Sequence, residues 1–559
     1  MSNLRISGIA SGLDTETMVR DLMKAERLRL DKFTQNKQLI QWKQEKYNSV
    51  NKDFANFVID LRKEMELIKT TSSGSNLANS SSNLSWVKKA VSSDENALTA
   101  SATSSAMGGI HKITVDSLAA GVSIASREKV MVGADKASSS TLLKDLNVDF
   151  GTDDGDIKSL TFEINVNGSA KAIEISYNAS DTIGSLVQKI NSATSNDTAK
   201  SSLGLQASFD NTTGRLFLST KATGEVAQIK VTADDSGLFT GPANKFKLDQ
   251  GVNDPILSVG TAKKGTDALI NYNGAIGLKY STNTFAINGI QINLNATSAS
   301  EITVKVDTDV DGVMNKIKSF VDKYNELIDK MNNTIGEKKY KDYLPLTKEQ
   351  KETLKEDEIK AWEEKSKSGL LKNDELITRA LSTMRNGLYE KVEGMEGVYN
   401  TLMSIGITTS EWKDKGKLVI DETKLKGAIM DDVDGVLNLL FKQPTATDSD
   451  TRKASGLMTR LFDDITVGMK SIITKSGTGD NASLYRNVQS NILIDFVTSM
   501  GSISNIDKDV FGFEKILAKE ETSLAKKEES YWRRFTAMEK ALQQMNSQSS
   551  WLAQQFSSN

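Results

Sequence analysis

The sequence contains no cysteine, one histidine and only 4 prolines among its 559 residues. Without cysteine there can be no disulfides, thiol nucleophiles or thiolate metal sites. A Ser-His-Asp triad or a histidine-rich metal site would have to use the single histidine, His111. Because His111 lies in an alternating segment, 110–115, that is typical of a β-strand, we interpret it as an ordinary strand histidine.

Long apolar runs are also missing, and neither sign of charge dominates. No segment approaches the ~20 apolar residues of a transmembrane helix. Residues 1–8 lack the charged region and apolar core of a Sec signal peptide, so we expect a cytoplasmic protein or export by another machine. With 70 basic and 73 acidic residues, the net charge of -3 creates no field that would attract nucleic acid.

Both ends of the chain carry apolar residues at a seven-residue spacing, which is the coiled-coil pattern. The first helix is predicted over 14–69, with Asp14 as its N-cap, and Asn36 and Lys43 interrupt its apolar stripe. The second stripe is predicted to be strongest from Tyr531 onward. The first stripe is Phe33, Ile40, Tyr47, Phe54, Leu61 and Ile68, and the second, with its partner register, is Leu517, Leu524, Tyr531, Phe535, Met538, Leu542, Met545, Leu552 and Phe556.

The composition changes between these two ends. Residues 70–82 are polar and predict a linker or loop, whereas 84–311 alternate between β-branched and polar residues and predict short strands. One helix is expected there, near 182–190. After 311 helical spacing returns, and the mixed-sign run 336–368 predicts a solvated helical surface. Turns between strands are predicted at 167–168, 213–214 and 288–289.

The predicted fold class is α+β multidomain, with long terminal coiled-coil helices, a helical leg domain and an inserted β-rich head of two subdomains. The simplest arrangement is a hairpin in which the terminal helices pair. Because a solvent-exposed apolar stripe is unfavourable, we expect these helices to be ordered only when they pack against each other or a partner. The predicted domains are terminal segments 1–45 with 515–559, a leg of 46–83 with 307–514, a head subdomain of 84–130 with 257–306, and an outer one of 131–256.

The sequence offers no convincing catalytic or metal-binding motif. Segment 307–312 opens like an EF-hand loop, but its twelfth position is Lys318, whose ammonium repels calcium, instead of a bidentate glutamate. The glycine spacing of 260–266 lacks the lysine with which a P-loop binds phosphates. We therefore expect no enzymatic activity, no cofactor and no metal site.

The N-terminal residues carry a specific motif. A glycine-serine stretch ends in Leu13-Asp14, and a helix with Leu22-Met23 and Ala25-Glu26-Arg27 follows. This motif closely resembles the flagellar filament cap family, also called flagellar hook-associated protein 2. The charged run 336–368 resembles an insert of cap proteins from Gram-positive flagellates. Further segments similar to this family or to other flagellar axial proteins are 113–119, 181–191, 214–219, 267–274 and 415–422.

The resemblance implies a structural role outside the cell. It implies a homo-oligomeric ring of about four to six subunits at the distal end of the bacterial flagellum, which promotes ordered insertion and polymerisation of exported flagellin. The implied partners are flagellin, hook-associated junction proteins and a cytoplasmic export chaperone on the C-terminal segment, with no nucleic acid and no membrane insertion. Export would pass through the flagellar type III channel without a cleavable Sec signal.

We interpret the apolar stripes as the residues that hold the legs and the filament, with intramolecular core packing as the alternative for some of them. Flagellin or a hook–filament junction protein would share terminal coiled coils, although the motif around Leu13 argues against both. A surface adhesin that uses the β head is a further alternative. The predicted assembly residues are Leu13, Leu22, Phe33, Ile40, Tyr47, Phe54, Leu517, Leu524, Tyr531, Phe535, Met538, Leu542, Met545, Leu552 and Phe556.

Overall fold

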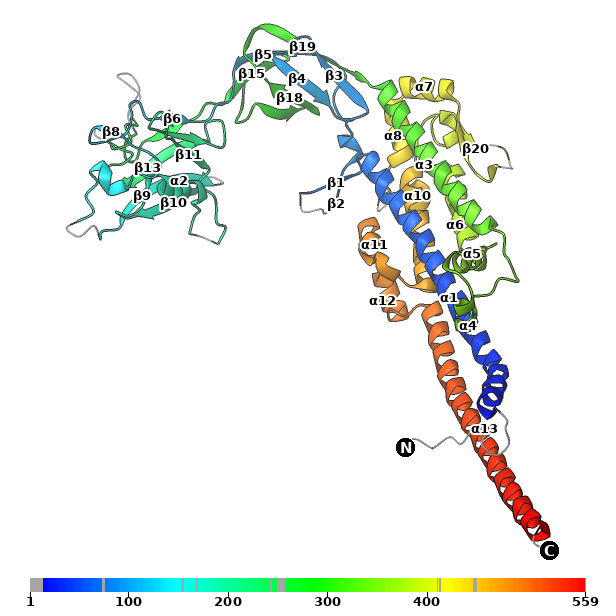
Figure 1. Cartoon of the computed structure of the whole chain (residues 1–559). Helices are drawn as coiled ribbons and strands as arrows, with labels where there is room; N and C mark the ends of the chain where they lie inside the picture. The colour runs from blue at the N-terminus through cyan, green and yellow to red at the C-terminus, as the bar shows by residue number, and fades with distance from the viewer. Residues whose placement is uncertain are drawn as a thin grey trace. The chain divides into compact units, whose positions relative to one another are not determined.

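The chain folds into two compact units in a computed structural model. One, the helical unit, comprises the described residues up to Ser81 and from Val310 onward; the other, the β unit, is Ser82–Asp309 (Figure 1). This composition confirms the predicted α+β multidomain class. The structure describes residues 14–72, 76–151, 155–166, 169–196, 198–241, 244–248, 257–409, 411, 414–445, 450–489 and 491–557.

The first helix, α1 (Thr15–Glu64), begins at the predicted cap, where the Asp14 carboxylate accepts a hydrogen bond from the Thr17 N–H at 2.9 Å. It ends before the predicted residue 69. Glu66 has a positive φ of 58°, which turns the chain out of the helix, and a short hairpin of β1 (Ile68–Thr70) and β2 (Asn76–Ala78) follows. The predicted linker or loop over 70–82 is thus interrupted by one short strand pair.

The helical unit is built around α1, which contacts α3 (Val310–Gly336) and α10 (Leu457–Ser476), while α10 also contacts α6 (Glu375–Tyr389). Phe54 and Leu61 on α1, Phe320 on α3 and Ile465 on α10 are buried in it. The smaller elements are α7 (Glu422–Asp431), α8 (Val433–Phe441), α9 (Thr451–Ala454), α11 (Ala482–Val488), α12 (Ile494–Met500), β20 (Ile407–Thr409) and β21 (Leu418–Ile420).

The charged run forms two exposed helices, α4 (Lys348–Thr353) and α5 (Glu356–Lys367), preceded by a non-helical stretch. This insert is attached to α1. The Gln35 side-chain amide donates to the Pro345 carbonyl at 2.7 Å, and the Lys367 ammonium lies 4.8 Å from the centre of the Trp42 ring. A solvated helical surface is thus confirmed for α4 and α5 but not for the residues before them.

In the β unit, one hydrophobic core lies between a five-stranded antiparallel sheet, ordered β16-β15-β5-β19-β3, and a three-stranded sheet, ordered β17-β18-β4. His111 is buried on β5, where its Nδ1 lies 2.8 Å from the Tyr272 hydroxyl and its Nε2 2.9 Å from the Met107 carbonyl. This confirms a strand histidine. The strands are β3 (Lys88–Ser92), β4 (Leu98–Ala102), β5 (Gly109–Ser117), β15 (Ala268–Tyr272), β16 (Ala275–Tyr280), β17 (Thr284–Ile287), β18 (Ile290–Leu294) and β19 (Ser298–Thr308).

A second core in the β unit joins a sheet ordered β10-β9-β13-β14, a sheet ordered β11-β12-β6, and helix α2 (Ile183–Ser192). The predicted helix near 182–190 and the turn at 213–214 are confirmed, and so is the turn at 288–289, where both φ angles are positive. The predicted turn at 167–168 lies outside the described residues. The remaining strands are β6 (Ser123–Ala125), β7 (Met131–Val132), β8 (Asp135–Lys136), β9 (Lys158–Val166), β10 (Ser169–Tyr177), β11 (Leu205–Asp210), β12 (Arg215–Thr220), β13 (Gln228–Asp234) and β14 (Ala262–Lys264).

The start of α2 gives the β unit a pH-dependent contribution to its stability. Burial alone raises the pKa of Asp181, but hydrogen bonds from Lys189, Asn178 and Ser185, at 2.7, 2.9 and 2.8 Å, outweigh burial and hold the pKa below its usual value. A lowered folded-state pKa stabilises the fold above the unfolded pKa of about 3.9, and this stability is lost as the pH falls through the folded value.

We therefore expect Asp181→Asn to lower the free energy of unfolding at pH 7 by about 1–2 kcal/mol, and the difference from the unmutated chain to shrink at pH 3. Urea denaturation of the full chain at both pH values measures it. Asp135→Asn, at an exposed carboxylate on β8, is the control and should change neither value. An equal loss at both pH values would show that the carboxylate charge is not responsible.

Candidate assembly surface

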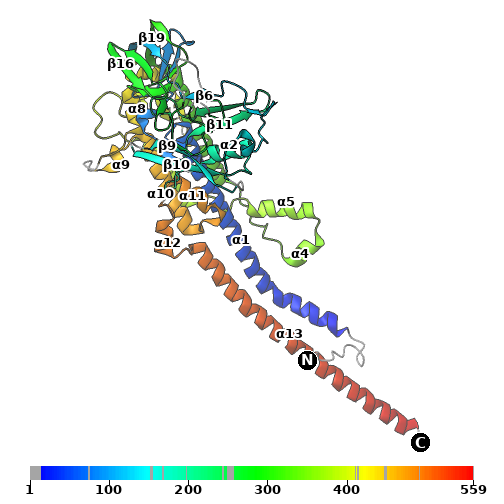
Figure 2. The ribbon, with the colours of Figure 1, turned by 90° about the vertical axis from the view of Figure 1, so that its left-hand side faces the viewer.

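The two terminal helices pair antiparallel within the helical unit. The second is α13 (Asn505–Ser557), and its first half lies beside α1 in both views (Figures 1 and 2). The contacts that join them are Gln44 to Asp507 at 2.8 Å, Lys37 to Glu514 at 2.8 Å, Phe33 to Phe513 with ring centres 6.5 Å apart, Arg29 to Glu520 at 3.1 Å, and Glu26 to Lys527 and Tyr531. The predicted pairing of two long helices is therefore present in one chain.

The start of α13 is firmly anchored. The Gln44 side-chain amide donates both to Asp507 and, at 2.8 Å, to the Ser476 carbonyl at the end of α10. Ser504 and Asp507 exchange hydrogen bonds, because each backbone N–H is bound by the other side chain. Burial alone raises the pKa of Asp507, but the hydrogen bonds from Ser504 and Gln44 outweigh it and keep the pKa below its usual value, so the carboxylate stays ionised.

Polar contacts continue toward the N-terminal end of α1. Hydrogen bonds from Lys527 and Tyr531 hold the pKa of the Glu26 carboxyl below its usual value. Beyond Tyr531, several side chains of α13 stay half-buried or buried as far as Leu542, and Val19 and Met23 near the start of α1 are buried as well. Helix α1 begins at Thr15, so it is too short to accompany the last turns of α13. That the stripe is strongest from Tyr531 onward stays a prediction.

The rest of α13 extends past the N-terminal end of α1 in both views (Figures 1 and 2). Residues 541–557, which we call the distal segment, contain no charged side chain. Four large apolar side chains project from it into solvent: Met545, Trp551, Leu552 and Phe556, which are 63%, 58%, 47% and 80% exposed. An exposed apolar helix face of this kind is a surface for partners.

The predicted assembly residues fall into four groups. Tyr47 and Phe54 are buried in the helical unit, where the Tyr47 hydroxyl donates to Asp374, the N-cap of α6; their packing is intramolecular. Leu13 lies outside the described residues. Leu22, Met545, Leu552 and Phe556 are exposed. The half-buried group is Phe33, Ile40, Leu517, Leu524, Tyr531, Phe535, Met538 and Leu542.

Two aromatic residues of this surface were not predicted from the sequence. Phe513 packs against Phe33 and lies four residues before Leu517, so the apolar stripe could have been extended one turn toward the N-terminus. Trp551 is exposed beside Leu552 and does not fit the seven-residue spacing. The composition of the segment could have indicated it, because Trp551 is a large apolar residue in a segment without charged side chains.

The rejected motifs gain no support from the fold. The EF-hand-like segment crosses from β19 into α3, and Lys318 pairs with Glu422 at 2.8 Å. Within the described ranges, no group of three or more histidine, aspartate or glutamate side chains could hold a metal ion. Also within those ranges, no helix combines the length and apolar character needed to cross a membrane.

Models of known protein families match most of the chain. The family model for the flagellar hook-associated protein 2 C-terminus matches residues 265–547, that for its N-terminus matches 11–121, and that for the flagellin hook IN motif matches 161–222. The chain is 29% identical to flagellar hook-associated protein 2 of Halalkalibacterium halodurans, over 99% of this chain and 100% of that protein. It is also 29% identical to the B-type protein of Pseudomonas aeruginosa, over 62% of this chain and 65% of that one.

Among solved structures, the D1-D2-D3 domains of the flagellar cap protein FliD from Escherichia coli match with a TM-score of 0.47 and 20% identity, over 77% of this chain and 96% of that one. Membership of a family follows from the sequence matches. The C-terminal family model alone spans more than half of the residues, and the first of these relatives aligns over its full length. The chain belongs to the flagellar hook-associated protein 2 family.

Proposed function

We propose that this chain caps the distal end of the flagellar filament as a homo-oligomer and promotes the ordered insertion of flagellin. The observation that carries the proposal is the distal segment of α13, which offers exposed apolar side chains and no charge. In a family of flagellar hook-associated proteins, such a segment suits burial among the helices of neighbouring subunits at the filament end.

The polar contacts between α1 and α13 suit a cap that rearranges as each subunit arrives beneath it. The ion pairs Arg29–Glu520 and Lys527–Glu26 each join an exposed cation to a partly exposed carboxylate, and ion pairs that solvent reaches add little stability. The helices can therefore separate and pair again at low free-energy cost. A continuous leucine stripe would hold them in one register.

The wider arrangement is part of the same proposal. Segments 1–45 and 515–559 would engage the filament, the leg (46–83 with 307–514) would connect them to the head, and the head (84–130 with 257–306, and 131–256) would form the outer plate. The partners are further copies of the chain, about four to six in a ring, flagellin, hook-associated junction proteins and an export chaperone at the C-terminal segment. The site of action is extracellular, at the tip of the flagellum.

The test is the double substitution Met545→Glu with Leu552→Glu, expressed in flagellated cells that lack their own cap gene. Two carboxylates on the apolar face would have to be desolvated on assembly, so we expect filament number per cell to fall by about tenfold or more. Circular dichroism of the purified full chain should show unchanged helix content, because both positions are exposed.

Ser550→Glu is the matched control, since it adds one carboxylate on the opposite face of the same segment. It should leave filament growth close to normal. Normal filaments from the double variant would show that the distal segment does not hold the filament end, and would remove the observation on which the proposal depends.

A further inference from the structure

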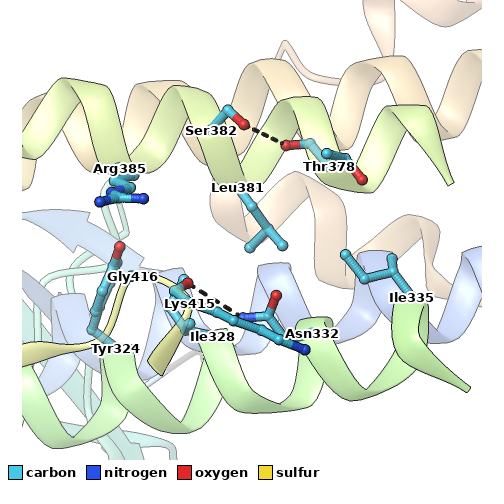
Figure 3. Close-up of a pocket in the computed structure, with 10 residues that line it drawn as sticks. All are labelled: Tyr324, Ile328, Asn332, Ile335, Thr378, Leu381, Ser382, Arg385, Lys415 and Gly416. Atoms are coloured by element: carbon cyan, nitrogen blue, oxygen red, sulfur yellow. Dashed lines mark hydrogen bonds between the residues drawn. The ribbon is translucent and has the colours of Figure 1, made fainter. Parts of the chain in front are cut away.

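A pocket of about 310 Å³ lies between α3 and α6 in the helical unit, beside the loop that contains Lys415 and Gly416 (Figure 3). Its walls are partly apolar, with Ile328 and Ile335 from α3 and Leu381 from α6. A volume near the lower end of the range for ligand sites, about 300–1,000 Å³, suits one or two inserted side chains.

One end of the pocket carries two cations and a buried hydroxyl. Arg385 and Lys415 are exposed, and neither side chain forms an ion pair within the described part of the chain. The hydroxyl of Tyr324, a fully buried residue, has no hydrogen-bond partner among the described residues and is directed toward Arg385 in Figure 3. Burial raises the pKa of Tyr324, so the hydroxyl keeps its proton. The two exposed cations, Arg385 and Lys415, suit an anionic acceptor such as a carboxylate.

The same unit carries a surface with the complementary properties, which we call the acidic ridge: residues 396–399 and 430–434. Val398 and Met430 are 78% and 67% exposed there, and the Tyr399 hydroxyl donates to Asp431 at 3.1 Å, which links the two segments. The ridge contains four carboxylates and no lysine or arginine. Of these carboxylates, that of Asp434 is exposed and unpaired within the described residues.

We propose that the acidic ridge of one copy of this chain docks into the α3–α6 pocket of a second copy. Met430 or Val398 would enter the apolar part of the pocket, and a carboxylate of the ridge would face Arg385 and Lys415. The distal segment of α13 does not fit this pocket, because it has no anionic side chain. The occupant is a second copy because ridge and pocket belong to one chain and are complementary in charge and polarity.

Pocket and ridge are different surfaces, so the contact is heterologous, and repeated contacts of this kind form either a closed ring or an open helix. The inference deepens the proposed homo-oligomeric cap and depends on it for its biological meaning. The contact itself is open to measurement on the purified protein, independently of filament growth.

The experiment is sedimentation equilibrium of the purified full chain, with filament growth in cells lacking their own cap gene measured in parallel. Arg385→Glu should weaken self-association by about tenfold, because it places like charges face to face. The matched control Arg379→Glu makes the same change at an exposed position of α6 outside the pocket and should have no effect. Combining Arg385→Glu with Asp434→Lys should recover most of the lost association.

Recovery by the charge exchange would support docking, since a folding defect would not be corrected by a second exposed substitution. Unchanged self-association of Arg385→Glu would overturn docking, and normal filament growth in the same cells would leave the capping proposal intact. Lost filament growth with unchanged self-association would also overturn it, because the pocket would then bind another partner. Self-association restored by the charge exchange in a chain that supports no filaments would instead refute capping alone.

Discussion

We expect replacement of Arg460 with methionine to lower the free energy of unfolding of the helical unit by about 3–5 kcal/mol. Arg460 has no exposed surface, and its guanidinium donates to main-chain carbonyls from two segments. Gly387 and Glu390, at 2.8 and 2.9 Å, are at the C-terminal end of α6. Arg452 and Lys453, at 3.0 and 2.7 Å, belong to α9.

These carbonyls lie at the ends of α6 and α9, and Arg460 supplies the cation that binds them. The C-terminal ends of helices leave carbonyl groups unpaired, and a cation there also interacts favourably with the helix dipole. The neighbouring Arg452 is already bound to Asp464 through two hydrogen bonds and to Glu390, and these interactions raise its pKa further above its usual value. Methionine at 460 fills much of the volume but removes the guanidinium donors from these carbonyls, of which that of Arg452 keeps the Ser455 N–H at 3.2 Å.

Chemical denaturation of the full chain, monitored by hydrogen exchange with mass-spectrometric detection, measures this loss. Peptides of the β unit provide an internal reference and should exchange as in the unmutated chain. Arg460→Lys should give an intermediate loss, since an ammonium has three donors where the guanidinium has five. Arg486→Met, at an exposed arginine, is the control. Wild-type stability of Arg460→Met would mean that these carbonyls find other donors.

The long helices and most of the β elements could be predicted because their signals are local. Asp14 caps α1, Thr182 caps α2, and the paired positive φ angles at 288–289 need a turn dipeptide of the kind found there. The end of α1 could not be predicted from the sequence. The apolar spacing continues through Ile68, although the chain leaves the helix at Glu66. The role of Arg460 could not be predicted either, because its partners are carbonyls up to 73 residues away in the sequence.

Only part of the candidate site could be predicted from the sequence, for a similar reason. A seven-residue spacing shows that one face of a helix is apolar, and it does not show what covers that face. Tyr47 and Leu552 occupy equivalent positions in their stripes, yet Tyr47 is buried against α6 while Leu552 is exposed. The difference depends on where α1 begins and on which distant helices surround it. The α3–α6 pocket has no sequence pattern, because its residues come from three separate segments.

The β unit has its own sensitive position, Gly265, where three chain segments meet between its two cores. The Gly265 N–H donates to the Ala227 carbonyl at 2.8 Å, and residues 120 and 266 exchange hydrogen bonds at 2.8 and 2.9 Å. A Cβ atom at Gly265 would lie 2.3 Å from the Ala120 carbonyl oxygen and 2.6 Å from that of Gly224. Both are main-chain atoms, so neither can move aside as a flexible side chain would.

We therefore expect Gly265→Ala to lower the free energy of unfolding of the β unit by about 3 kcal/mol, at the upper end of the cost of overpacking. Hydrogen exchange on the full chain should show faster exchange around 117–122 and 263–267, with the helical unit unchanged. Gly108→Ala is the matched control, since its Cβ would meet only the Val306 carbonyl oxygen at 3.7 Å and should cost less than about 0.5 kcal/mol. If Gly265→Ala is no less stable than Gly108→Ala, the three segments do not cross as closely as the structure places them. Arg460→Met and Gly265→Ala then serve as controls for each other, because each should destabilise one unit and spare the other.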